Sequence, residues 1–457
     1  MQAMSTRTRR QFVAAAALFL ATAGATAAPP WQPAARGLVF TEAGHPLSFV
    51  PGRDDGLALS SFSIGQLAVS PNGRHWVLTA TGTATAETPS RQVVLSGGPR
   101  GLRLAAVQGD LLPGLELAFS QNPDLVAIGN GGDFAFGMSV AGAGSGDRQM
   151  VARYRMATSG YEKVARQGDE IPGLAASVPA AAGERYGSQL AVAAVLDDGR
   201  VGFVARGTSG PLPGSVDDFL LVDGDPVQVV LQGGVFVPAG QADGGSAVLA
   251  NLERRAGMTA DGGRWLAWGQ LAGPGAPDVV VVDGEVALRE GQPVPGLAGD
   301  VFAPTTTMGG SGSWTARGTS TAGERYLIVD GVLRVLQGQP IDGLPELGPV
   351  ENINSASVNR HGDLAYAIST ADGRPWIIVE PAGGGPALVA VSDRTRLNVG
   401  ASSRGVLYYG GTLGGSDLGV ALGDNRMLYF MTRAQDRNRR NVADGLFVIG
   451  LPPPRPR

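Results

Sequence analysis

Short runs of alternating apolar and small residues, separated by glycine turns, make up most of this chain. In residues 188–232 four such runs follow one another, at 188–195, 200–207, 218–222 and 226–231. Asp197-Asp198-Gly199 joins the first two runs and Asp223-Gly224 joins the last two, and both sequences are typical of tight hairpins. The unit therefore predicts a four-stranded antiparallel sheet. Because apolar or small side chains line both faces of this sheet, both faces must be covered by neighbouring sheets.

The turn into the second strand of this unit recurs along the chain. Its clearest copies begin at Gly132, Gly199 and Gly362, where a small and an aromatic residue follow the turn, as in Gly132-Asp133-Phe134-Ala135-Phe136. Weaker copies begin at Gly73, Gly263, Gly312 and Asn425. Seven such turns, spaced about 50 to 70 residues apart, are typical of the blades of a β-propeller.

A second repeated element is a strand that runs into a Gly-Pro corner. Its fullest copy covers residues 163–174, and near-copies cover 106–115, 288–297 and 335–344, with a degenerate copy from Val229. The element recurs because each blade needs the same corner, so we expect its Asp110 and Asp169 to be structural.

The two ends of the chain are predicted to share one blade. The last unit has strands at 420–422, 427–432 and 445–449 but no fourth strand, whereas residues 38–47 resemble the fourth-strand element. We therefore predict an all-β fold, a propeller of seven four-stranded blades closed by the N-terminal strand. Residues around Phe40 should pair with those around Phe447, which removes two free sheet edges. The propeller domain is placed at residues 37–451.

The first 27 residues have the pattern of an export signal. Arg9 and Arg10 lie in its basic end, Phe12 begins its short apolar core, and Ala25 and Ala27 belong to a small-residue cleavage site. The Arg pair with Phe12 resembles a twin-arginine signal, although Val13 and Ala14 replace the expected Leu and Lys. Twin-arginine export and Sec export therefore both stay open. We expect a linker at 28–36, a Pro-rich tail at 452–457, and a periplasmic or extracellular protein.

Composition narrows the chemistry. The chain has no Cys, which excludes disulfides, thiol catalysis and cysteine-based zinc sites. Its three His leave few ligands for a metal site. Loss of residues 1–27 removes three arginines and no acid, so the formal charge moves from −4 to −7. An acidic protein has no electrostatic reason to bind nucleic acid. After the signal, no apolar run is long enough to span a membrane, and we expect neither cofactor nor metal.

The repeats resemble a known family. The Val-Ala-Arg-Gln-Gly-Asp-x-x-Pro-Gly-Leu element and the Asn359-to-Tyr366 turn are similar to bacterial tandem-repeat proteins named after an Asn-x-x-Gly-x-x-Ala-Phe motif. The likeness covers most of residues 38–450. It implies an exported protein of repeated β structure, and it brings no catalytic residues.

Candidate sites follow from propeller connectivity. The tight glycine turns should share one face, and the longer links the other, so we expect a ligand on the long-link face. Its candidate residues are four arginines of one loop, Arg433, Arg437, Arg439 and Arg440, which could hold an acidic glycan or phosphate. Against this, a solvated loop explains them too. His75, Asp217-Asp218 and Asp223-Gly224-Asp225 are interpreted as structural.

No catalytic motif is present, and Gly142 to Gly146 form a glycine-rich loop without a helix behind it. We therefore predict a noncatalytic propeller that binds a protein or a surface glycan. The alternatives are a propeller hydrolase or lyase acting on a polysaccharide or lactone, and a purely structural envelope protein. An enzyme should gather carboxylates, or a His with a carboxylate, at the channel mouth.

Overall fold

The computed structural model describes residues 34–62, 66–84, 89–141, 148–223, 225–233, 235–238, 247–301, 304–400, 402–413 and 419–452. The predicted signal, with Arg9, Arg10, Phe12, Ala25 and Ala27, lies outside these residues. So do most of the predicted linker, residues 142–147 and the end of the tail. The first strand, β1 (Ala35–Phe40), begins two residues before the predicted start of the propeller.

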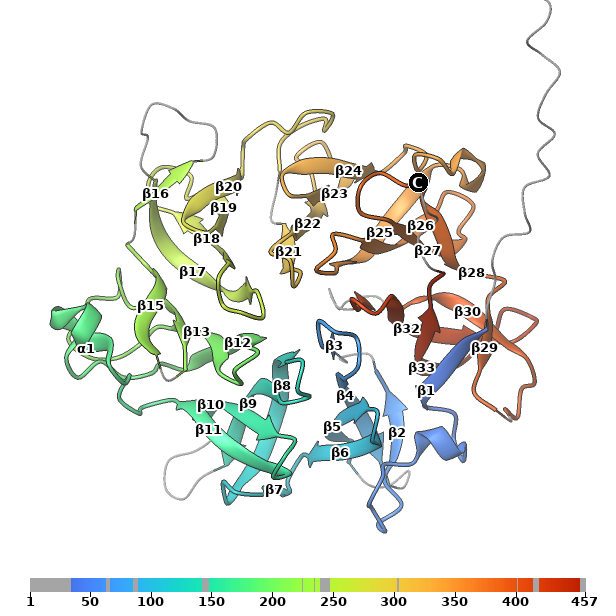
Figure 1. Cartoon of the computed structure of the whole chain (residues 1–457), viewed down its shortest axis with the longest axis horizontal. Helices are drawn as coiled ribbons and strands as arrows, with labels where there is room; N and C mark the ends of the chain where they lie inside the picture. The colour runs from blue at the N-terminus through green and yellow to red at the C-terminus, as the bar shows by residue number, and fades with distance from the viewer. Residues whose placement is uncertain are drawn as a thin grey trace, which may run out of the picture. The chain divides into compact units, whose positions relative to one another are not determined.

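Seven antiparallel sheets form a ring, and each contributes four strands, a to d from the centre outward (Figure 1). Blade 1 contains β3 (Leu67–Val69), β4 (Trp76–Thr83), β5 (Arg91–Gly98) and β6 (Gly101–Val107). Blade 2 contains β8 (Leu117–Ile128), β9 (Phe134–Ala141), β10 (Arg148–Arg155) and β11 (Gly160–Arg166). Blade 3 contains β12 (Gln189–Val195), β13 (Val201–Arg206), β14 (Phe219–Val222) and β15 (Asp225–Leu231), which confirms the four predicted strands of this unit.

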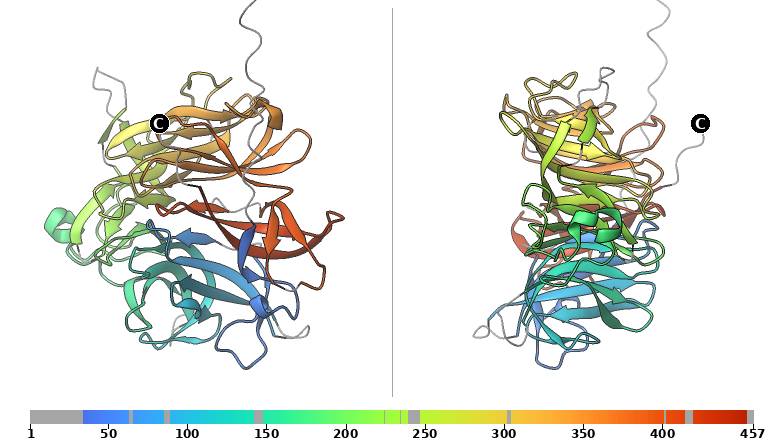
Figure 2. Two further views of the ribbon diagram at one scale, coloured as in Figure 1. Left: turned by 45° about the vertical axis from the view of Figure 1, so that its right-hand side comes forward. Right: turned by 90° about the vertical axis from the view of Figure 1, so that its left-hand side faces the viewer.

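The next three blades repeat this order. Blade 4 contains β17 (Ala247–Met258), β18 (Trp265–Leu271), β19 (Asp278–Val282) and β20 (Glu285–Arg289). Blade 5 contains β21 (Thr305–Met308), β22 (Trp314–Thr319), β23 (Arg325–Val329) and β24 (Val332–Leu336). Blade 6 contains β25 (Val350–Val358), β26 (Leu364–Thr370), β27 (Pro375–Glu380) and β28 (Leu388–Ser392). In the edge-on view the blades lie in one layer (Figure 2).

Blade 7 joins the two ends of the chain. Its strands a to c are β31 (Val420–Leu422), β32 (Met427–Gln435) and β33 (Asn441–Gly450), and β1 is its fourth strand. Gly37 pairs with Phe447 and Phe40 with Gly445, in antiparallel register. The predicted closure is therefore confirmed at the predicted residues. A ring closed in this way leaves neither terminal strand as a free edge of its sheet.

Several short elements extend the blades beyond the predicted strands. β2 (Ala58–Ser61) pairs with β4, β7 (Leu111–Leu112) with β8, and β16 (Val235–Pro238) with both β17 and β20. In blade 7, β29 (Arg396–Asn398) runs parallel to β1 and pairs with β30 (Leu407–Thr412), which also pairs with β32. The helical segments are α1 (Leu174–Ser177), η1 (Pro46–Ser48), η2 (Pro179–Ala181) and η3 (Pro345–Leu347). Among the described residues no helix has the length and apolar character needed to cross a bilayer.

The core lies between blades rather than within one. Six clusters of buried side chains each combine residues of two neighbouring blades. Val77 and Val94 of blade 1, for example, pack with Phe134 and Phe136 of blade 2. This packing is the expected consequence of sheets whose two faces are both apolar.

The seven turns between strands a and b share one geometry. In each, the fourth residue donates its backbone N–H to the carbonyl of the first, at 2.7 to 3.1 Å, and has a positive φ. That residue is Gly in six turns, where the absence of a Cβ removes the strain of this conformation. In blades 4 and 7 it is Gly262 and Arg426, one residue away from the predicted Gly263 and Asn425.

Hydrogen bonds join these a–b turns across blade boundaries. Asn72 donates its backbone N–H to Asn130 Oδ1 at 2.8 Å, and Asn130 Nδ2 donates to Asp197 Oδ1 at 2.8 Å. Across the closing junction, the Asp424 N–H donates to the Pro71 carbonyl at 2.8 Å. Further bonds of this kind connect blades 3 and 4, 5 and 6, and 6 and 7. Hydrogen bonds between a–b turns therefore join six of the seven pairs of neighbouring blades on the tight-turn face.

Candidate functional site

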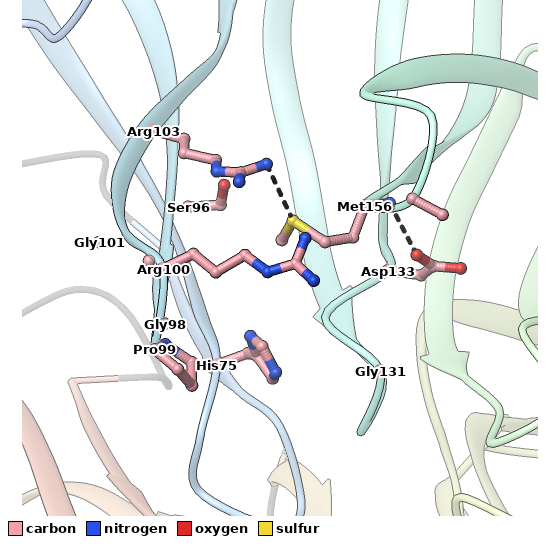
Figure 3. Close-up of a pocket in the computed structure, with 12 residues that line it drawn as sticks. His75, Ser96, Gly98, Pro99, Arg100, Gly101, Arg103, Gly131, Asp133 and Met156 are labelled. Carbon is pink, nitrogen blue, oxygen red and sulfur yellow. Dashed lines mark hydrogen bonds between the residues drawn. The ribbon is translucent and has the colours of Figure 1, made fainter.

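A cavity of about 370 Å³ lies between blades 1 and 2 on the tight-turn face. Four turns enclose it: the a–b and c–d turns of blade 1, and the same two turns of blade 2 (Figure 3). Its lining consists of His75, Ser96, Gly97, Gly98, Pro99, Arg100, Gly101, Arg103, Gly131, Asp133, Met156 and Ala157. The volume falls within the range of small-molecule sites, about 300 to 1,000 Å³. We call it the blade 1–2 pocket.

His75 forms one wall of the pocket and is held by two glycines. It follows the first a–b turn and precedes Trp76, the first residue of β4. A Cβ at Gly98 would lie 2.5 Å from His75 Nδ1, and one at Gly132 would lie 2.9 Å from it. Within the described residues, the buried Nδ1 has no hydrogen-bond partner. Burial lowers the pKa of His75, and the nearby Arg74 and Arg100 lower it further, so the imidazole is neutral at pH 7.

Two arginines from the c–d hairpin of blade 1 supply the positive charge. Arg100 lies in the turn between β5 and β6, and Arg103 lies on β6. Both side chains extend towards Met156 of blade 2 (Figure 3). Arg103 Nη1 donates to Met156 Sδ at 3.4 Å, and a thioether is a weak acceptor. In the described part of the chain, no carboxylate lies within salt-bridge distance of either guanidinium.

The remaining polar groups differ in how far they are already satisfied. Asp133 accepts from Arg155 Nη1 at 2.9 Å and from the Met156 backbone N–H at 2.8 Å. Its charge is therefore compensated by Arg155, which does not line the pocket. Ser96 is 1% exposed, and its Oγ is buried without a partner among the described residues. The pocket therefore combines an excess of positive charge with two unsatisfied polar atoms, one on His75 and one on Ser96.

A second cavity, of about 200 Å³, occupies the central channel. Strand a of every blade contributes to its lining, with small and aliphatic residues such as Ala68, Ala127 and Val420. The charged residues of the lining are Arg360 and Asp424, whose Nε and Oδ2 lie 3.0 Å apart. This described lining has one carboxylate, already paired, and no histidine. It does not form the carboxylate cluster that a hydrolase would place there.

Of the four predicted arginines, Arg433 lies near the end of β32. Arg437, Arg439 and Arg440 lie in the link between β32 and β33, on the face opposite the pocket. Arg439 Nη2 pairs with Asp393 at 2.8 Å and Arg433 Nε with Asp444 at 3.4 Å. Asp436 shapes the loop by accepting the backbone N–H of Arg440 at 3.0 Å. Arg437 belongs to the same turn. The four arginines are close in sequence, and the ion pairs of Arg433 and Arg439 are made with acidic residues of the fold. A ligand at this loop stays a prediction.

The acidic residues interpreted as structural take structural contacts. Asp218 is 4% exposed and accepts the backbone N–H groups of Gly207 at 2.9 Å and Leu252 at 3.0 Å. Burial raises the pKa of Asp217, and the neighbouring Asp218 raises it further. Asp223 pairs with Arg153 at 2.6 Å. No group of three or more potential metal ligands occurs among the described residues.

The two corner aspartates are also paired. Asp110 lies 2.5 Å from Arg91 Nη2, and Arg53 binds the same carboxylate. Asp169 lies 2.6 Å from Lys163 Nζ. Both contacts fit the structural interpretation of the repeated corner.

Sequence reasoning missed the blade 1–2 pocket. It considered His75 alone and did not consider Arg100 or Arg103. The available signal was the pair of arginines around the short Pro99-Arg100 turn, close in space to the next a–b turn. Reading it requires the register between two blades, which a single sequence does not supply.

A family model matches residues 72–306, just over half of the chain, and this region includes every residue that lines the pocket. The chain belongs to DUF7453, a family of unknown function. Comparison with curated proteins gave no match for this DUF7453 chain. The likeness to tandem-repeat proteins stays a resemblance.

Solved structures that resemble the DUF7453 chain are distant in sequence, and two of the three named below are propellers. The Dos1 propeller is 9% identical over 92% of this chain and 96% of its own, with a TM-score of 0.38. The β-propeller domain of the Trilobed protease from Pyrococcus furiosus is 8% identical over 85% and 94%, with a TM-score of 0.42. A protein of unknown function from Dyadobacter fermentans DSM 18053 is 11% identical over 92% and 100%, with a TM-score of 0.32. These likenesses carry no functional argument.

Proposed function

We propose that this protein is an exported, noncatalytic propeller that binds a protein or a surface glycan. The observation that carries the proposal is the blade 1–2 pocket, which presents hydrogen-bond donors but no activated nucleophile. Ser96 Oγ and His75 Nδ1 are both buried without partners in the described residues, so no base is in place to activate the hydroxyl. A preformed cavity with donors and no reacting pair is suited to recognition.

The hydrolase or lyase alternative is less well supported. Such enzymes need a general acid and a base, commonly two carboxylates facing the substrate. The described channel lining has Asp424 alone, paired with Arg360, and Asp133 in the pocket is held by Arg155. The structural alternative is less well supported too, since a purely structural ring needs no pocket with unsatisfied polar groups.

Binding and turnover can be separated in one experiment. The mature chain, residues 28–457, is applied to a glycan array and to immobilised envelope proteins, and the same preparation is incubated with polysaccharides and lactones. We expect saturable binding to one ligand class without product release. Product release would overturn the noncatalytic proposal, and the absence of any saturable binding would favour the structural alternative.

The face that binds is tested with one combined variant. Replacement of Arg433, Arg437, Arg439 and Arg440 by Ser removes the positive charge of the long-link loop. We expect this variant to bind as the wild type does, because the pocket lies on the opposite face. If it abolishes binding, the ligand is held by the long links, as connectivity alone predicts.

Export is tested separately from binding. The proposal rests on residues 1–27, so we expect the mature protein in the periplasm or medium to have lost them. Mass spectrometry of the fractionated protein measures its first residue. An unprocessed chain confined to the cytoplasm would contradict export while leaving the binding proposal intact.

A further inference from the structure

The blade 1–2 pocket carries a more specific inference, which rests on the proposed binding function. We propose that its ligand is a sugar acid, free or at the end of a glycan, whose carboxylate lies between Arg100 and Arg103. Three properties of the pocket point to this ligand: its charge, the shape of its walls, and its size.

Charge selects an anion. Arg100 and Arg103 line the cavity without a carboxylate partner in the described residues, while the one acid of the lining, Asp133, is neutralised by Arg155 at 2.9 Å. The whole chain has a formal charge of −4, so this positive pocket is a local exception. A planar guanidinium with several donors fits a carboxylate in bidentate geometry, which gives orientation as well as attraction.

The walls select a ligand with a flat ring. Gly97, Gly98 and Gly101 line the cavity within the paired strands β5 and β6, so the missing side chains leave a flat wall of backbone. A sugar ring can lie on this wall, and its hydroxyl groups can accept from the guanidinium N–H groups that the carboxylate leaves free, because each arginine has five such donors. The aliphatic stem of an acidic peptide side chain offers no such acceptors.

Size separates a sugar acid from a simple ion. A cavity of about 370 Å³ has space for a ring in addition to its carboxylate, while sulfate or phosphate would leave most of it to water. Met156, contributed by blade 2, offers an apolar surface for the carbon skeleton. We therefore expect glucuronate or galacturonate to bind more tightly than inorganic phosphate.

His75 gives the site a pH dependence. The charged groups that face it are Arg74 and Arg100 on its own blade, Arg103 on β6, and Asp133 on blade 2. In the empty pocket its pKa is lowered by burial and then by the two nearest arginines. A bound carboxylate compensates those arginines and favours protonation of His75. By linkage, affinity should rise as pH falls from 7.5 towards 5.5.

The test is isothermal titration calorimetry of the mature chain with glucuronate, galacturonate, glucose, inorganic phosphate and an Asp-containing peptide. The variants are Arg103→Gln, Arg100→Gln and His75→Gln, with Arg289→Gln, at an exposed side chain on β20, as the matched control. Loss of a charge-assisted pair should weaken binding of the sugar acid about tenfold or more. The control should bind as the wild type does, and His75→Gln should lose the pH dependence. Urea unfolding midpoints equal to that of the wild type show that a variant is folded.

Each outcome decides the inference. Tight binding of a sugar acid that depends on Arg100 and Arg103, without binding of glucose, supports it. Equal or tighter binding of phosphate or of the peptide overturns the sugar-acid assignment. If the array identifies a neutral glycan or a protein whose binding is unchanged in Arg103→Gln, the inference fails while the proposed function stands. If no ligand binds in either experiment, the proposed function fails first.

Discussion

Truncation of Phe40 tests whether the joined chain ends stabilise the propeller. The Phe40 side chain is 0% exposed, with ring centroids 5.2 Å from His45 and 6.5 Å from Phe447, both in edge-on geometry. Loss of a fully buried Phe ring costs about 3–5 kcal/mol. Because two aromatic contacts disappear with it, each worth about 0.5–1.5 kcal/mol, we expect the upper part of that range.

The assay is urea unfolding of Phe40→Ala, with Phe49→Ala as the matched control. The control makes the same substitution nine positions away, at a side chain that is 51% exposed, so it should change the free energy of unfolding little. We expect the midpoint of Phe40→Ala to fall by much more than that of the control. A loss below about 1 kcal/mol, or one equal to the control, would refute the idea that β1 completes blade 7 in solution.

Three further predictions concern a turn glycine, a buried acid and a tyrosine. Gly362→Ala, at a φ of 80°, should cost about 1–2 kcal/mol of unfolding free energy, whereas Gly131→Ala, in open space, should be neutral. Equal effects would contradict the turn geometry. Asp218→Asn should cost about 2 kcal/mol, because a buried carboxylate that accepts two backbone N–H groups is lost. The exposed Asp198→Asn should leave the midpoint unchanged, and similar losses would argue against the Asp218 contacts. Burial raises the pKa of Tyr366. Its contribution to the free energy of unfolding is therefore complete below about pH 10, the usual pKa of tyrosine, and is lost as pH rises above that value. In a spectroscopic pH titration, the phenolate absorbance of Tyr366 should therefore develop only when the protein unfolds. Ionisation of Tyr366 in the folded protein would contradict this prediction.

The fold could be predicted because its signals are local and repeated. Glycine at the fourth position of an a–b turn relieves a steric strain that arises within four residues, so it recurs in six of the seven turns. The Asp-Gly hairpins behave alike: Asp283 and Gly284 both have positive φ, as do Asp330 and Gly331. Even the ring closure was predictable, since a unit lacking one strand and a spare strand at the other end complement each other.

The additions to the blades were not predictable from the same signals. β29 and β30 lie outside β1 in blade 7, and β16 pairs with two strands of blade 4. These segments are short, and their pairing partners are chosen by tertiary contacts rather than by a hairpin next to them. The a–b turn of blade 7 lies one residue from its predicted position for a similar reason. Its fourth residue, Arg426, has a positive φ, which an arginine in the sequence does not predict. Arg426 Nη1 bonds Asp363 of blade 6 at 3.0 Å, a partner 63 positions away.

The pocket was not predictable because long links were expected to bind and tight turns to be structural. The hydrogen bonds of the tight-turn face explain why it can do both. Asn72 and Asn130 tie the a–b turns of blades 1 and 2 together, and Asn130 is tied in turn to Asp197 of blade 3. The pocket lies directly beside these hydrogen-bonded turns of blades 1 and 2. Its walls are therefore held in place before any ligand arrives, and a preorganised site loses less conformational entropy on binding than a long loop would.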